Sequence, residues 1–180
     1  QMGDFSWTDV EDKSISTGMN KIESFAGIYD GNGRTISDMS YQGTNTSNYT
    51  NVGLFSELKN GAEIKNLNFS NIAFRNVSKD CGTIAGAASG DITIDNMDVS
   101  ENRCTLDAGG MYMSRASYAT ITNVRICKNE AGRTGGGINS CGVMKLSDAV
   151  ISENTAAVDG GGISTNRSGH RLVQDEAGTY

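Results

Sequence analysis

Two acidic residues and one basic residue have the types and spacing needed for acid–base chemistry. Asp95 and Asp98 lie three residues apart, and Arg125 follows on a segment of similar pattern. Paired carboxylates, or a carboxylate with a basic partner, are groups that cleave polysaccharides. One interpretation is therefore a carboxylate–arginine site. The alternative is an exposed ion pair that contributes ~0–1 kcal/mol and has no catalytic role. We predict the ion pair.

One histidine and four cysteines are the next candidates for a site. His170 lies in "SGHRL", where the repeat pattern described below decays, and we predict no catalytic role for it. Four cysteines allow three connectivities, which the sequence leaves open. Because no two share a column of adjacent repeats, vertical disulfides are not indicated and diagonal pairing stays open. The cysteines, which lack the CxxC spacing of zinc sites, are Cys81, Cys104, Cys127 and Cys141.

Three acidic positions raise the question of calcium. The "DGNG" segment at 30–33 lacks the further oxygen ligands and late glutamate of an EF-hand loop, so we predict a plain turn. Asp107 and Asp159 precede glycine clusters in equivalent positions, where we predict that they cap turns. We therefore expect no metal site and no cofactor.

Composition narrows the classes of partner. The chain has 180 residues and a net charge of −6, with acidic and basic residues interspersed. A nucleic-acid-binding protein would concentrate positive charge, so we expect no nucleic-acid partner. No apolar run approaches the ~20 residues that span a bilayer, so we expect no membrane span.

A short pattern recurs every 25 to 30 residues and organises these candidates. Its order is apolar, polar, Asn or Asp, apolar, polar, apolar. Such a period predicts the coils of a parallel β-solenoid, because a helix needs 3.6-residue periodicity and a β-sandwich does not require the same columns to recur. The five copies are "TISDMSY" (35–41), "EIKNLNF" (63–69), "TIDNMDV" (93–99), "TITNVRI" (120–126) and "KLSDAVI" (145–151).

Alternation within the pattern predicts inward apolar columns that stack from coil to coil. The first column would begin with Ile36 over Ile64 and continue through Ile94 and Ile121. The polar residue between the apolar positions would sit at a bend, where Asn and Asp tolerate left-handed φ and bond to their neighbours. We predict a structural ladder of Asp38, Asn66, Asn96, Asn123 and Asp148.

Glycine clusters follow the last repeats and predict a second corner. Glycine at a corner permits positive φ or a close approach of backbones. The predicted corner residues are Gly109, Gly110, Gly136, Gly137, Gly161 and Gly162.

The repeats resemble two families. "YDGNGRTI", "GLF" and "AEIKNL" look like the GLUG-type repeats of bacterial surface adhesins. The later "AGGM" and "GGGI" clusters, with "VSEN", "ICKN" and "ISEN", are similar to polymorphic outer membrane protein repeats, although Val or Ile replaces the phenylalanine of the FxxN motif. Both resemblances imply a surface-exposed, right-handed parallel β-helix of the pectin-lyase-like kind, and neither implies catalysis.

We expect one all-β domain over residues 1–180, a right-handed parallel β-helix of about six coils. Residues 1–24 would lead in, 25–165 would form the coils, and 166–180 would be an incomplete coil or tail. We predict a non-enzymatic extracellular or cell-surface module that is structural or adhesive, either a filament subunit that stacks end to end or a fragment of a larger surface adhesin. Its partner would be another copy stacked end to end, a host-surface ligand, or glycans. The alternative is a polysaccharide lyase, a glycosidase or a glycan-binding protein of the same fold.

Overall fold

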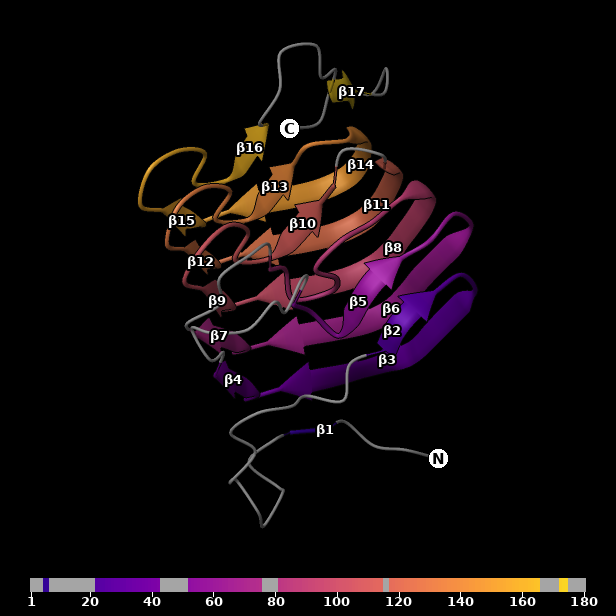
Figure 1. The fold of residues 1–180 in the computed structure, drawn as a ribbon, viewed down its shortest axis with the longest axis horizontal. Coiled ribbons are helices and arrows are strands. Elements are labelled where there is room, and N and C mark those ends of the chain that lie inside the picture. Colours follow the sequence, from indigo (N-terminus) through magenta and orange to yellow (C-terminus); the bar gives the residue numbers. More distant parts are fainter. Residues whose placement is uncertain are drawn as a thin grey trace.

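The chain folds as a parallel β-solenoid in a computed structural model. The structure describes residues 5–6, 22–42, 52–75, 81–114, 117–165 and 172–174. These ranges contain strands and short connecting turns but no helix. The strands wind through about four turns of the solenoid. Figure 1 shows the strands of successive turns stacked one above another, with the N-terminal turns at the bottom. The predicted all-β parallel solenoid is confirmed.

One sheet, here called the long sheet, runs through every turn. Its seven strands are parallel, and neighbouring strands come from successive turns. In spatial order they are β1 (Phe5–Ser6), β3 (Ile28–Ser37), β6 (Ala62–Ser70), β8 (Gly90–Ser100), β11 (Ser117–Cys127), β14 (Val143–Ser152) and β17 (Leu172–Gln174).

Because the described residues include no helix, no candidate for a membrane-spanning helix arises among them.

Shorter parallel sheets form the rest of each turn and close the cross-section. The five-stranded sheet contains β4 (Ser40–Gln42), β7 (Ala73–Arg75), β9 (Arg103–Cys104), β12 (Glu130–Ala131) and β15 (Thr155–Ala156). The three-stranded sheet contains β10 (Met111–Met113), β13 (Ile138–Ser140) and β16 (Ile163–Thr165), and the two-stranded sheet contains β2 (Ile22–Phe25) and β5 (Phe55–Leu58).

Alternation along the long sheet places its apolar residues in the interior. Ile64, Ile94 and Ile121 pair across β6, β8 and β11, and each is at most 1% exposed. Leu146 continues this column on β14. The other inward columns pair as predicted in the later repeats, as Met97–Val124–Ala149 and Phe69–Val99–Ile126–Ile151. Their register is therefore confirmed from β6 onward.

The register predicted for the first repeat is wrong. The sequence pattern pairs Ile36 with Ile64, whereas in the structure Tyr29 pairs with Ile64 and Ile36 pairs with Phe69. The cause is an irregularity in β3 at the "DGNG" segment, where the pairing with β6 shifts. A bulge adds residues to one strand only, so an ungapped alignment across it fails.

Asp38 consequently lies in a different column from Asn66, which corrects one member of the predicted ladder. Asp38 accepts a hydrogen bond from Asn71 Nδ2 at 2.8 Å. Just beyond it, Tyr41 on β4 pairs with Phe74 on β7 rather than with the long sheet. The segment "TISDMSY" therefore matches the end of the next repeat and not its beginning.

All five predicted ladder residues, including Asp38 with a φ of +60°, have the left-handed backbone conformation that a bend requires. The φ angle is +52° at Asn66, +51° at Asn96, +51° at Asn123 and +49° at Asp148. Most side chains disfavour this left-handed region, whereas Asn and Asp tolerate it. These residues can therefore turn the long strands at little conformational cost.

The glycine clusters serve two separate purposes. Positive φ occurs at Gly135 and Gly160, and at Ala108 in the equivalent place, which all precede the predicted corner glycines. The corner glycines themselves allow backbones to approach: a Cβ on Gly110 or Gly137 would lie 2.5–2.6 Å from the carbonyl oxygen of the next coil. Crowding between coils therefore explains Gly109, Gly110, Gly136 and Gly137, whereas a Cβ on Gly161 or Gly162 in the last cluster would meet no atom of a further coil.

Candidate functional site

The carboxylates and the arginine considered for catalysis lie on the outer face of the long sheet. Arg125 on β11 pairs with Asp98 on β8, and Arg125 Nη1 lies 2.7 Å from Asp98 Oδ2. Asp95 Oδ1 accepts hydrogen bonds from Thr122 Oγ1 at 2.7 Å and from Asn123 Nδ2 at 2.9 Å. Each carboxylate is therefore held by a residue of the next coil.

The electrostatics of this face favour charged, paired groups. The hydroxyl of Thr122 and then the amide of Asn123 lower the pKa of Asp95 below its ordinary value. The carboxylate of Asp98 raises the pKa of Arg125. A general acid at neutral pH needs the opposite shift, a carboxyl pKa raised toward the working pH. The geometry at Asp95 therefore suits a surface interaction between coils and does not supply a proton donor.

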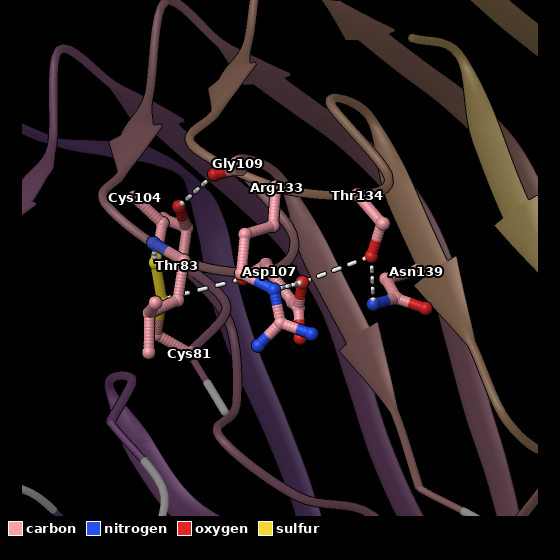
Figure 2. Close-up of a disulfide and its surroundings, with 9 residues drawn as sticks. Cys81, Thr83, Cys104, Asp107, Gly109, Arg133, Thr134 and Asn139 are labelled. Carbon is pink, nitrogen blue, oxygen red and sulfur yellow. Dashed lines mark hydrogen bonds and ion pairs between the residues drawn. A yellow bond between two sulfur atoms is a disulfide. The ribbon is translucent and has the colours of Figure 1, made fainter. Parts of the chain in front are cut away.

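A disulfide and a chain of buried polar side chains lie together in the described residues. We call this group the disulfide corner, and it comprises Cys81, Cys104, Asp107, Thr134 and Asn139 (Figure 2). The Cys81–Cys104 disulfide joins Cα atoms 6.6 Å apart, and both cysteines are at most 1% exposed. The disulfide links β9 to the segment that follows β7. It therefore joins residues of two different columns, which is the diagonal kind of pairing that the sequence left open.

Asp107 anchors the glycine corner through a chain of side-chain hydrogen bonds. Asn139 Nδ2 donates to Thr134 Oγ1 at 2.9 Å, and Thr134 Oγ1 donates to Asp107 Oδ1 at 2.9 Å. Arg133 Nε lies 3.6 Å from the same carboxylate oxygen. The carbonyl oxygen of Asp107 lies 3.3 Å from Cys81 Sγ, so the chain reaches the disulfide. The arrangement ties three consecutive coils together.

The disulfide corner offers little for catalysis or metal binding. Its thiols are consumed in the disulfide, and Thr134 has a carboxylate neighbour but no histidine or lysine among the contacts described. Asp159 pairs with Thr134 in the next coil but is exposed. Within the described ranges, no group of three or more His, Cys, Asp or Glu residues is placed to hold a metal ion. His170 lies outside the described residues.

A second asparagine column lies inside the solenoid and was not predicted. Asn129 is 0% exposed, and its Oδ1 accepts hydrogen bonds from the backbone N–H of Asn102 at 3.0 Å and from Asn102 Nδ2 at 2.9 Å. Its Nδ2 donates to Val99 O at 2.8 Å and to Asn154 Oδ1 at 3.0 Å. We call Asn102, Asn129 and Asn154 the inner ladder. The signal for it was present in the sequence as the repeated apolar–x–x–Asn motif.

The predicted ladder on the exposed face, here called the outer ladder, has a less continuous chain of hydrogen bonds than the inner ladder. Asn96 Nδ2 donates to Asn66 Oδ1 at 2.7 Å, and Asn66 Nδ2 donates to Asp30 Oδ1 at 2.9 Å. Asn123 Nδ2 instead donates to Asp95, one residue away from the expected partner Asn96. The outer asparagines therefore join some coils directly and others through a neighbouring carboxylate.

Comparisons with known proteins identify no relative. No family model, no curated protein and no solved structure matches this chain.

Proposed function

We propose that this protein is a non-enzymatic structural or adhesive module that acts outside the cell and associates through the ends of its solenoid. The observation that carries the proposal is the changed burial at the last coil. Ile121, Ile126 and Ile138 are 0% exposed, whereas the residues above them, Leu146, Ile151 and Ile163, are only half-buried. Continued coil stacking would bury that surface.

The strand edges at this end support the same proposal. β15 and β16 each lie at the edge of their sheet, with no ladder partner beyond them in the described ranges. β17 pairs with β14 over Met144–Leu146 and leaves the rest of the long strand's edge without a described partner. Unpaired strand edges favour association with another parallel strand. A second copy of the chain, stacked end to end, is the partner that we propose.

The location and chemistry of the module are part of the proposal. A buried disulfide supports an oxidising, extracellular environment, because disulfides are rare in the cytosol. The paired carboxylates of the long sheet support a non-catalytic role over the lyase or glycosidase alternative. Release of reducing sugars or of unsaturated uronates from polysaccharides would contradict this part of the proposal.

The finer architecture is also proposed. We expect right-handed coils, because parallel strand connections are right-handed in nearly all proteins. We expect about six coils in all, since β1 and β17 extend the long sheet beyond the four or so turns described. An experimental structure of the whole chain would test both the handedness and the number of coils, and would show whether the resemblance to adhesin repeats extends to them.

One glycine provides a sharp test of end-to-end stacking. A Cβ on Gly110 or Gly137 would lie 2.5–2.6 Å from a carbonyl oxygen of the next coil. In the last coil, a Cβ on Gly162 meets only Ile151 Cγ2, at 3.6 Å. A copy stacked in register would bring a carbonyl to Gly162 as well. The Gly162→Ala variant should therefore fold normally but associate less.

The experiment compares wild type, Gly162→Ala and a control, Thr120→Ala, which changes the exposed face of the long sheet. Electron microscopy and sedimentation across a range of concentrations would measure association, and thermal unfolding would check the fold. We expect wild type and Thr120→Ala to form end-to-end assemblies, and Gly162→Ala to form fewer. Wild-type protein that stays monomeric, or a Gly162→Ala variant that assembles as wild type does, would refute the stacking proposal.

A further inference from the structure

Two Asn-Gly pairs occur in the sequence, Asn32-Gly33 and Asn60-Gly61. Asparagine is one of the thermolabile residues of proteins. A glycine after it makes the following backbone nitrogen accessible and the chain flexible, so that this nitrogen can attack the side-chain amide. Because the two pairs are chemically equivalent, the structure around them must decide whether they differ in reactivity.

Asn32-Gly33 lies where the long sheet is irregular. The pairing of β3 with β6 includes Asp30 and Arg34 but passes over the residues between them. Asn32 is exposed, has φ +52°, and its side chain forms no hydrogen bond within the described residues. A Cβ on Gly33 would meet no atom within 4 Å, and the same holds at Gly61, so the two pairs differ in their hydrogen bonds and not in the space around the glycine.

Asn60-Gly61 is held at both reacting groups by the next coil. Asn60 Oδ1 accepts a hydrogen bond from the backbone N–H of Asp91 at 2.9 Å. The backbone N–H of Gly61 donates to the carbonyl oxygen of Asp91 at 2.8 Å. The nitrogen that would attack and the amide that would be attacked are thus both engaged, and reaction requires this turn to open first.

We propose that Asn32 is a site of spontaneous deamidation in the folded protein and that Asn60 is protected. In the reaction, the backbone nitrogen of Gly33 bonds to Asn32 Cγ and loses its proton, while the Cγ–Nδ2 bond breaks and ammonia leaves. Water then opens the cyclic imide at either carbonyl. The product at position 32 is an aspartyl residue or an isoaspartyl residue, whose main chain is longer by one methylene group.

The modification would act on the first coil. Asp30 Oδ1 accepts hydrogen bonds from the backbone N–H of Asn32 at 2.8 Å and from Asn66 Nδ2 at 2.9 Å. These bonds, that of Asn66 first, lower the pKa of Asp30. A new carboxylate at position 32 would repel that of Asp30. Deamidation would therefore weaken the contact between the first coil and β6 as the protein ages.

Incubation of the intact, disulfide-bonded protein at mildly alkaline pH tests the proposal. Peptide mapping by mass spectrometry would follow the mass increase at each Asn-Gly pair over time, and enzymatic methylation would quantify isoaspartate. Because Asn60 must first lose two hydrogen bonds, we expect it to react about tenfold more slowly than Asn32. In denaturant, where both turns are open, the two rates should become equal.

An Asn32→Ser variant, which lacks the reacting amide, serves as the matched control and should show no change in that peptide. Equal rates at the two pairs in the folded protein would overturn the proposal, as would faster reaction at Asn60. It would also fail if neither pair reacted in the folded state while both reacted in denaturant. None of these outcomes depends on whether the solenoids stack.

Discussion

At the residue scale, buried asparagines take over a position that earlier coils fill with apolar side chains. Ile72 precedes Asn102 in this column, and the backbone N–H of Ile72 donates to Asn102 Oδ1 at 3.0 Å. From Asn102 onward, each amide satisfies backbone groups of the adjacent coil. Buried polar groups stabilise a fold only when they are fully hydrogen-bonded. The inner ladder meets that condition best at Asn129.

Replacing Asn129 by isoleucine tests the inner ladder, because Ile72 shows that the column accepts this side chain. The change removes Asn129 Oδ1, the acceptor for both the backbone N–H and the side-chain Nδ2 of the buried Asn102. Each buried donor left without its acceptor costs about 1–3 kcal/mol, so we expect Asn129→Ile to lower the free energy of unfolding by about 3 kcal/mol. Urea titration would measure it, with Thr120→Ala as a surface control. Unchanged stability in Asn129→Ile would show that packing alone suffices there.

The lowered pKa of Asp95 predicts a pH dependence with a definite sign. A carboxyl group whose pKa is lower in the folded state contributes stability above its unfolded pKa and loses that contribution as pH falls through the folded pKa. For Asp95 the loss begins near the ordinary value of 3.8. Thermal midpoints of wild type should therefore fall more steeply than those of Asp95→Asn as the solution is acidified below this value. Parallel curves would contradict the assignment.

At the element scale, contacts between coils give equivalent glycines different roles. Gly137 and Gly162 occupy the same place in successive clusters. A Cβ on Gly137 would lie 2.6 Å from Gly162 O and 2.9 Å from Asn154 Nδ2, whereas at Gly162 the nearest atom is 3.6 Å away. The requirement for glycine therefore comes from the neighbouring coil and not from the φ angle of the residue itself.

This difference predicts unequal costs for the same substitution. Gly137→Ala should lower the free energy of unfolding by about 2 kcal/mol, because backbone atoms must shift to admit the methyl group. Gly162→Ala should change it by less than about 0.5 kcal/mol. Chemical denaturation at concentrations where the protein is monomeric would measure both. Equal effects would mean that crowding by the next coil does not select glycine in this column.

At the scale of the whole molecule, a disulfide ties the segment after β7 to β9. Cys81 and Cys104 are 23 residues apart in sequence, and Cys127 and Cys141 are free and buried. A cross-link of this kind stabilises mainly by restricting the unfolded chain. The solenoid otherwise depends on repeated contacts between adjacent coils, so a covalent link should limit opening where it spans them.

We expect two reactive thiols per chain when the unreduced protein is denatured, which are those of Cys127 and Cys141. Replacing both Cys81 and Cys104 by serine should lower the free energy of unfolding by about 2–4 kcal/mol. Thiol titration and urea unfolding would check the two parts. Four thiols in the unreduced, denatured protein would show that the disulfide does not form.

The sequence by itself determined the repeat. Inward residues such as Ile94, Ile121 and Val124 could be placed in columns because alternation within a strand is a local property and equal coil lengths preserve the register. The bends at Asn66, Asn96 and Asn123 followed from residue type for the same reason, since the tolerance for positive φ belongs to the residue.

Only the tertiary structure decided features that depend on neighbours in space. The bulge in β3 moved Ile36 and Asp38 into other columns, and no local pattern reveals which strand carries an extra residue. The pairing of Cys81 with Cys104 required the path of the chain across the solenoid, because a disulfide depends on the separation of Cα atoms. Whether an asparagine lies inside, as Asn129 does, or outside, as Asn96 does, likewise depends on which face of the coil encloses the core.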